Sequence, residues 1–214
     1  MAVIFNKTSN TLVSGTDSAD SIKNGGYDSV DGWSYLEDVT IESGAGNDTI
    51  DSTDDYFTFF DEEPDGRLIQ YADGDGNDIV NAFNRNDTIQ LLNNSTVSSI
   101  SKNGNDIIVS IGSGSINLKN TSDIKTPIYF IDQNKNESAF VFDGNDSVKV
   151  DIYDSTASIE GADGNDAIKI RADYYNDDTT IDTGLGNDTI YHLDYSSRSN
   201  FIYDEGDGED VIYG

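Results

Sequence analysis

Short runs of the chain alternate between hydrophobic and polar residues with a period of two. In the C-terminal part these runs are residues 147–150, 157–160, 167–170 and 179–182. A period of two is typical of half-buried β-strands, and no segment sustains the 3.6-residue period of a helix. The pattern therefore predicts an all-β protein.

A glycine-rich turn that ends in aspartate precedes many of the predicted strands. It occurs six times, with the aspartate at position 48, 78, 146, 166, 188 or 210. The last four aspartates are 20, 22 and 22 residues apart, and each interval reads as strand, turn, strand and glycine–aspartate turn. Repetition at such a period is typical of stacked repeats, in which each repeat buries its apolar residues against its neighbours. The repeat predicts a parallel β-solenoid, or β-roll, with two short strands in each rung.

The rest of the chain divides the predicted solenoid into two halves. Residues 1–83 form the first half, in which Asp20, Asp28, Asp38 and Asp48 follow one another at half-rung spacing, and residues 54–71 read as a strand, an acidic loop and a returning strand. Residues 84–131 contain Asn103-Gly104 and Gly112-Ser-Gly114, which favour hairpin turns, so we predict an antiparallel β insert. Residues 132–214 form the second half. The chain stops where another glycine-rich turn would begin, so we expect it to be the front piece of a longer repeat protein.

The charge of the chain indicates a need for cations. The formal net charge is −29, from 41 acidic and 12 basic residues, and a folded chain of this charge repels itself. The absence of a basic patch argues against binding to nucleic acid or to anionic lipid. The sequence has no cysteine, so metal ligands must be oxygen atoms, which suit calcium. No segment reaches the ~20 apolar residues of a membrane span, and no N-terminal signal peptide is visible.

The residue types of the turn suit a calcium half-site. Glycine permits positive φ and a close backbone approach, while the final aspartate supplies a hard carboxylate. Stacked rungs lie ~4.8 Å apart, so two neighbouring turns can together offer the six to eight oxygen ligands that calcium prefers.

These turns resemble the hemolysin-type calcium-binding repeat of the RTX family, a nonapeptide that forms a parallel β-roll with calcium between its turns. The resemblance implies calcium as the cofactor, with the aspartate side chain and backbone carbonyls of the turn as ligands. The metal positions that it implies are Asp20, Asp28, Gly44, Gly46, Asp48, Gly74, Gly76, Asp78, Asp146, Asp163, Gly164, Asp166, Gly184, Gly186, Asp188, Gly206, Gly208 and Asp210. The first glycine of the repeat is replaced by Ser43, Asp73, Thr183 and Glu205. We therefore expect a single edge of three calcium ions between the four turns that end at 146, 166, 188 and 210.

Other candidate sites have simpler interpretations. Residues 73–84 and 132–143 resemble EF-hand loops only in part, and the second segment favours a strand–turn–strand hairpin. His192, with Asp194 and Ser196 nearby, lies on one strand, where a catalytic triad cannot assemble. The recurring C-terminal tyrosines favour a stacked ladder over a carbohydrate platform. Trp33 with Tyr35 could be either a ligand platform or a packed pair of loop aromatics.

The function predicted from the sequence is that of a non-enzymatic calcium-binding β-roll module of a secreted or surface bacterial protein. Its folding would be coupled to calcium, its role would be structural or adhesive, and a cell-surface glycan or protein could be its partner. Two alternatives stay open. One is a carbohydrate-active β-helix enzyme, a lyase or an epimerase, although the four arginines form no local cluster. The other is a glycan-binding module that uses the aromatics around residues 27–60.

Overall fold

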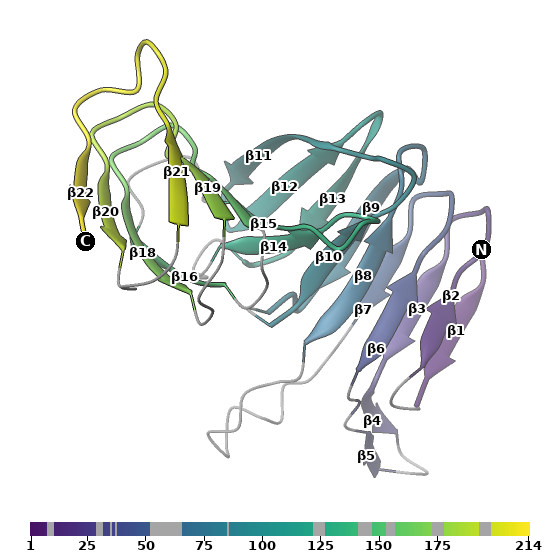
Figure 1. Ribbon diagram of the computed structural model, residues 1–214. Coiled ribbons are helices and arrows are strands. Elements are labelled where there is room, and N and C mark those ends of the chain that lie inside the picture. Colours follow the sequence, from purple (N-terminus) through teal and green to yellow (C-terminus); the bar gives the residue numbers. More distant parts are fainter. Residues whose placement is uncertain are drawn as a thin grey trace. The chain divides into compact units, whose positions relative to one another are not determined.

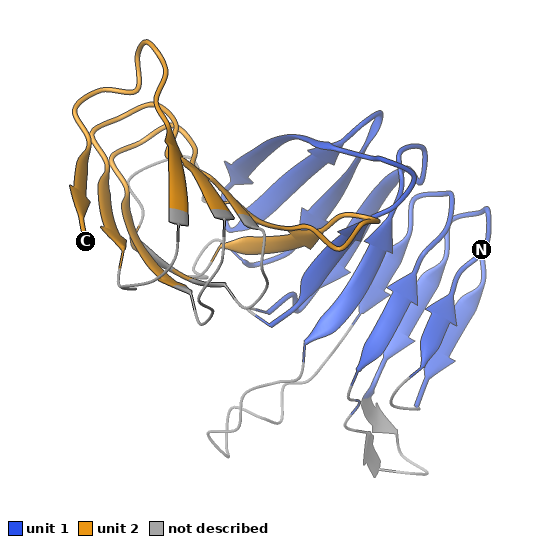
Figure 2. Cartoon of the chain, in the orientation of Figure 1, with its two compact units in different colours: residues 1–123 blue, residues 124–214 orange. Residues whose placement is uncertain are grey.

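The fold of the chain is all-β, as predicted. The computed structural model describes residues 1–7, 11–28, 32–34, 36, 38–51, 66–84, 86–121, 127–140, 147–152, 157–172, 178–192 and 198–214. All regular elements among these residues are strands (Figure 1). The described part of the chain has no helix that is long and apolar enough to cross a membrane. The chain forms two compact units, Met1–Asp123 and Ile124–Gly214 (Figure 2).

Unit 1 contains two sets of parallel strands. The first sheet has the spatial order β1 (Val3–Asn6), β3 (Ser21–Asn24), β7 (Thr49–Asp51), β9 (Asn77–Asn81), β13 (Gly114–Leu118), β12 (Asp106–Ile111) and β11 (Val97–Asn103). The second set has the order β2 (Leu12–Ser14), β6 (Val39–Glu42), β8 (Arg67–Tyr71) and β10 (Thr88–Leu91). Parallel pairing runs from β1 to β13 and from β2 to β10. From β6 to β10 the chain passes alternately from one set to the other, so equivalent turns stack on one another.

The segment predicted as an antiparallel insert is continuous with these parallel strands. Strands β11, β12 and β13 do form the two predicted hairpins. However, β10 pairs in parallel with β8, and β13 pairs in parallel with β9. The contacts therefore place residues 84–121 within unit 1, whereas the sequence predicted a boundary after residue 83. Of the predicted strand, loop and returning strand at 54–71, only residues 66–71 are described, and they contain the whole of β8.

The close spacing of the N-terminal aspartates has two structural origins. Asp38 immediately precedes β6 in the second set of strands, as half-rung spacing requires. Asp28 instead ends β4 (Gly26–Asp28), which forms an antiparallel hairpin with β5 (Gly32–Ser34). The prediction of a rung at Asp28 was therefore wrong, because a hairpin excursion brings its aspartate equally close to its neighbours in the sequence.

Unit 2 repeats the parallel arrangement. One group of strands has the order β14 (Ile128–Ile131), β15 (Glu137–Phe140), β17 (Ala157–Glu160), β19 (Asp178–Asp182) and β21 (Arg198–Ile202). The other sheet has the order β16 (Ser147–Ile152), β18 (Ala167–Ala172), β20 (Thr189–His192) and β22 (Val211–Tyr213). All neighbours are parallel except β14 and β15, which form a hairpin. Its turn and its second strand lie in the segment 132–143 that was predicted to form a hairpin, whereas its first strand, β14, precedes that segment.

Columns of aliphatic residues form the cores of the two units. In unit 1, Ile22, Ile50 and Val80 lie in register on successive strands and are all buried. In unit 2, Ile168 and Ile190 form the same kind of column. Because side chains of a strand point alternately to opposite faces, this register also sets the position of the aspartate two residues before each of these core residues.

Candidate metal-binding site

Aspartates at the ends of the turns form a hydrogen-bonded ladder in each unit. In unit 1 the backbone N–H of Asp20 donates to Asp48 Oδ1 at 2.6 Å, and that of Asp48 donates to Asp78 Oδ1 at 2.9 Å. In unit 2 the N–H of Asp166 donates to Asp188 Oδ1 at 2.8 Å, and that of Asp188 donates to Asp210 Oδ1 at 2.9 Å. One oxygen of each acceptor carboxylate is therefore used to join two rungs.

The glycines allow the turns to stack backbone on backbone. In the turn of residues 73–78, Gly76 has φ +113, and a Cβ atom added to it would lie 1.7 Å from the carbonyl oxygen of Gly46 on the preceding rung. Asparagine side chains add a second ladder in the opposite direction, since Asn47 Oδ1 accepts the N–H of Asn77 at 2.9 Å. Glycine is thus required here by both conformation and space.

The second oxygen of each carboxylate depends on the first residue of the preceding turn. Asp78 Oδ2 accepts a hydrogen bond from Ser43 Oγ at 2.8 Å. Asp210 Oδ2 accepts one from Thr183 Oγ1 at 3.4 Å. Ser43 opens the turn that ends at Asp48, one rung before Asp78, and Thr183 opens the turn that ends at Asp188, one rung before Asp210. A hydroxyl at this position therefore completes the carboxylate on the next rung, in the sense that it donates a hydrogen bond to the second carboxylate oxygen.

Glycine at the same position leaves a carboxylate oxygen without a donor. On the rung that precedes Asp48, the turn that ends at Asp20 opens with Gly15. On the rung that precedes Asp188, the turn that ends at Asp166 opens with Gly161. Asp48 Oδ2 and Asp188 Oδ2 are buried, and no described residue donates a hydrogen bond to either. A side chain cannot be placed there, because a Cβ on Gly15 would lie 1.9 Å from Ser43 O and one on Gly161 would lie 2.0 Å from Thr183 O.

Burial makes this negative charge unfavourable. Burial raises the pKa of the Asp48 carboxyl, and the charges of Asp20 and Asp75 add to the effect against the opposing hydrogen bond from Asp20 N–H. Burial also raises the pKa of the Asp188 carboxyl. The Asp166 N–H opposes this shift, and so does the nearby Thr183 hydroxyl, although that hydroxyl hydrogen-bonds to Asp210 Oδ2 and not to Asp188 Oδ2. A buried carboxylate that lacks a donor is costly unless a positive charge lies beside it.

Asp78 and Asp20 show how hydrogen bonds change this balance. Burial raises the pKa of Asp78 to about 7 in spite of its bonds from Asp48 N–H and Ser43 Oγ. At the first rung, bonds from the Ala2 N–H and the Thr16 hydroxyl lower the pKa of Asp20. Negative charge is therefore least favourable on the inner rungs.

The oxygen atoms available as metal ligands suit a hard cation. The described residues contain no group of three or more His, Cys, Asp or Glu side chains that could hold a metal ion. Each orphaned carboxylate oxygen instead belongs to a ladder of turns that stack backbone on backbone, with Gly15 against Ser43 O and Gly161 against Thr183 O. An all-oxygen set of this kind suits calcium better than a transition metal.

Most of the predicted positions are brought together in the two ladders. In unit 1 they are Asp20, Gly44, Gly46, Asp48, Gly74, Gly76 and Asp78, and in unit 2 they are Asp163, Gly164, Asp166, Gly184, Gly186, Asp188, Gly206, Gly208 and Asp210. Asp28 lies apart from the ladder in the hairpin of β4 and β5. Asp146 lies outside the described residues.

Sequence reasoning missed the roles of Gly15, Gly161, Ser43 and Thr183. The departure of Ser43 and Thr183 from the first glycine of the repeat was visible, and it was the only available signal. The sequence does not show that each hydroxyl faces a carboxylate on the next rung, 35 residues away for Ser43 and 27 for Thr183.

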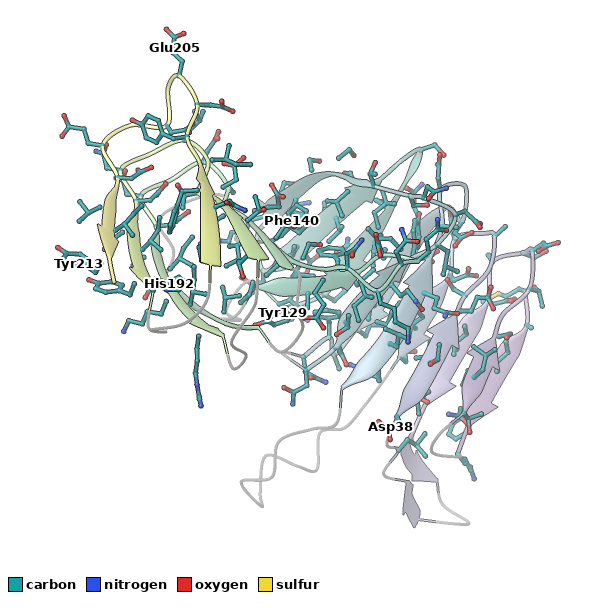
Figure 3. The ribbon with its side chains drawn as sticks, viewed as in Figure 1. Asp38, Tyr129, Phe140, His192, Glu205 and Tyr213 are labelled. Carbon is teal, nitrogen blue, oxygen red and sulfur yellow. The ribbon has the colours of Figure 1, made fainter. Side chains whose placement is uncertain are left out.

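The other candidate groups form ordinary structural contacts. Asp132 Oδ1 accepts the backbone N–H groups of Asn134 and Asn136, as in a polar turn. His192, labelled in Figure 3, hydrogen-bonds through Nε2 to Ser199 Oγ at 2.8 Å, and its sequence neighbours Asp194 and Ser196 lie outside the described residues.

The aromatic candidates are placed in part. Tyr191 and Tyr213 stack with ring centroids 5.1 Å apart, which confirms the predicted tyrosine ladder for this pair. Trp33 lies in β5, and Tyr35 lies outside the described residues.

Comparison with known proteins yields no assignment. No protein-family model matches the sequence, and no curated protein is significantly similar to it. The resemblance to the RTX repeat therefore depends on the turn residues alone.

Proposed function

We propose that this protein is a calcium-binding β-solenoid module with a structural or adhesive role rather than an enzyme. The alternation of the chain between sets of parallel strands supports the solenoid. The stacked turns of the RTX type, with their glycines in close backbone contact, support the β-roll form of it.

The observation that carries the proposal is the pair of buried, orphaned oxygens, Asp48 Oδ2 and Asp188 Oδ2. These two carboxylates would each supply one ligand, and carbonyls of the two adjoining turns would supply others. Calcium would add the positive charge that the ladders lack. The hydroxyls of Ser43 and Thr183 already complete Asp78 and Asp210, so we place calcium at Asp48 and Asp188 rather than along every turn.

The proposed ligand set implies a weak site that responds to extracellular calcium. Extracellular calcium modules bind with a dissociation constant of ~10⁻⁴ to 10⁻³ M. At that affinity the module would be loosely ordered in a calcium-poor cytoplasm and would become ordered outside the cell. A secreted or cell-surface location follows as part of the proposal.

Thermal unfolding with calcium and with a chelator tests the proposal. The only tryptophan, Trp33, reports on unit 1 by fluorescence, and the only histidine, His192, reports on unit 2 by NMR. Calcium at 100 times its dissociation constant should stabilise a one-site unit by about 2.7 kcal/mol. Magnesium, which holds its water more tightly, should raise the melting midpoint by less than calcium does.

Variants of the ladder separate calcium binding from general charge effects. Asp48→Asn should abolish the calcium-induced rise in the melting midpoint of unit 1, and Asp188→Asn should abolish that of unit 2. Asp78→Asn is the matched control, because Ser43 already completes that carboxylate, and it should keep the rise. Melting midpoints that are the same with calcium and with chelator would reject the proposed function.

A further inference from the structure

The turn of residues 82–87 has an aspartate in the ladder position at the opposite edge of unit 1. The aspartate turns described above lead from the second set of strands to the first sheet, whereas this turn leads from β9 back to β10. Strands β10 and β8 pair with Thr88 opposite Leu68, so Asp87 lies opposite Arg67. The backbone N–H of Arg67 donates to Asp87 Oδ1 at 2.9 Å. This is the same bond that joins successive aspartates in the other ladders.

The side chain of Arg67 supplies the positive charge of this turn, beside the backbone N–H of Asn84, which donates to Asp87 Oδ2 at 2.8 Å. Its Nε donates to Asp87 Oδ1 at 2.8 Å, and its Nη2 forms a close ion pair with Asp87 Oδ2. The same Nη2 donates to the carbonyl oxygen of Ala82 at 2.6 Å. Arg67 is 4% exposed and Asp87 is 1% exposed. The guanidinium thus contacts a buried carboxylate and a turn carbonyl, the two kinds of oxygen proposed as calcium ligands at Asp48 and Asp188.

We propose that Arg67 is a built-in cation in a position equivalent to a calcium site, and that this position accepts a divalent cation when the guanidinium is removed. The comparison with calcium rests on the proposed function. At this edge the guanidinium of Arg67 holds Asp87 and the Ala82 carbonyl together at any calcium concentration. No described residue supplies such a cation at the Asp48 turn. One edge of unit 1 would therefore be stabilised by an arginine of the chain and the other by bound calcium.

An ordinary buried ion pair would behave differently. Loss of one partner from a buried pair is destabilising because it leaves an uncompensated charge, but a purely structural arginine would not be replaced by a metal ion. Recovery by calcium is therefore the distinguishing measurement.

The experiment compares three variants by Trp33 fluorescence melting and by calcium titration of the full chain. In chelator, Arg67→Ala should lower the melting midpoint of unit 1 by about 10 °C. Calcium should raise that midpoint by more than it raises the wild type, and the variant should bind one more calcium ion. Arg67→Met fills the space without a charge, so it should be destabilised but should gain no calcium ion. Lys119→Ala, which removes the more exposed ion pair with Asp106, should show neither effect.

A neutral pair covers the case in which Arg67→Ala fails to fold in chelator. Arg67→Met with Asp87→Asn removes both charges and should refold without calcium, while Arg67→Ala should fold only when calcium is present. The proposal is overturned if Arg67→Ala binds the same number of calcium ions as wild type, or if it stays unfolded with calcium while the neutral pair folds. The wild-type response to calcium tests the proposed function separately, because the inference about Arg67 concerns only the excess response of the variant.

Discussion

Acidification should stabilise unit 1 when calcium is absent, because Asp78 is buried. Burial raises the pKa of this carboxyl to about 7 from its ordinary value of 3.8. The folded state therefore binds the proton more tightly than the unfolded state does. The resulting stability is fully present below about pH 3.8 and is lost as the pH rises through about 7.

The size of the effect follows from the two pKa values. Between pH 8 and pH 5.5 the difference in proton binding at Asp78 corresponds to about 2 kcal/mol. For a unit of this size that is a rise of about 8 °C in the melting midpoint. Burial also raises the pKa of Asp48 and Asp75, which act in the same direction. Hydrogen bonds lower the pKa of Asp20 and Asp73, so these groups act only at lower pH.

The assay is thermal unfolding of the full chain in chelator at several pH values between 5.5 and 8, followed by Trp33 fluorescence. The matched variant is Asp78→Asn, whose amide can accept from Asp48 N–H and donate to Ser43 Oγ. Its midpoint should depend much less on pH than that of wild type. A wild type that does not gain stability on acidification, or an Asp78→Asn variant whose melting midpoint depends on pH as strongly as that of wild type, would show that Asp78 does not bind this proton.

Two further predictions concern the turns. Ser43→Gly removes the hydroxyl that completes Asp78 and reproduces the arrangement at Gly15, so it should destabilise unit 1 in chelator by about 1–3 kcal/mol. It should also add one calcium ion in a titration, whereas Ser43→Thr, which keeps a hydroxyl, should add none; equal stoichiometry in Ser43→Gly and wild type would contradict this role of the hydroxyl. Gly76→Ala and Gly74→Ala alter two glycines of positive φ in the same turn, but an added Cβ at Gly76 meets Gly46 O at 1.7 Å and one at Gly74 meets nothing within 4 Å. Denaturant unfolding should therefore show a loss of about 3 kcal/mol or more for Gly76→Ala and of about 1–2 kcal/mol for Gly74→Ala, and equal losses would argue against stacked turns.

The local features of the chain were predictable from its sequence. Alternation over 147–150 and 167–170 predicted β16 and β18, because side chains that alternate between core and solvent produce a period of two along the chain. The hairpin of β14 and β15 was predictable for the same reason, since both of its strands and its turn lie within a few residues of one another. Equal aspartate intervals likewise predicted that Asp166, Asp188 and Asp210 lie in register.

Contacts between distant residues were decided by the tertiary structure. The spacing of Asp28 equals that of a rung, but its strand pairs with β5 in a hairpin. The parallel pairing of β13 with β9 joins residues 38 positions apart and makes the predicted insert part of unit 1. Neither pairing has a signal in the local pattern of hydrophobic residues.

The sequence by itself determined that the chain is all-β and that glycine–aspartate turns recur along it. Only the tertiary structure decided what completes each aspartate. Ser43 completes Asp78, Arg67 completes Asp87, and no described residue donates to Asp48 Oδ2. The physical reason is that an aspartate's charge is compensated by groups on the neighbouring rung, and those groups lie some 20 to 35 residues away in the chain.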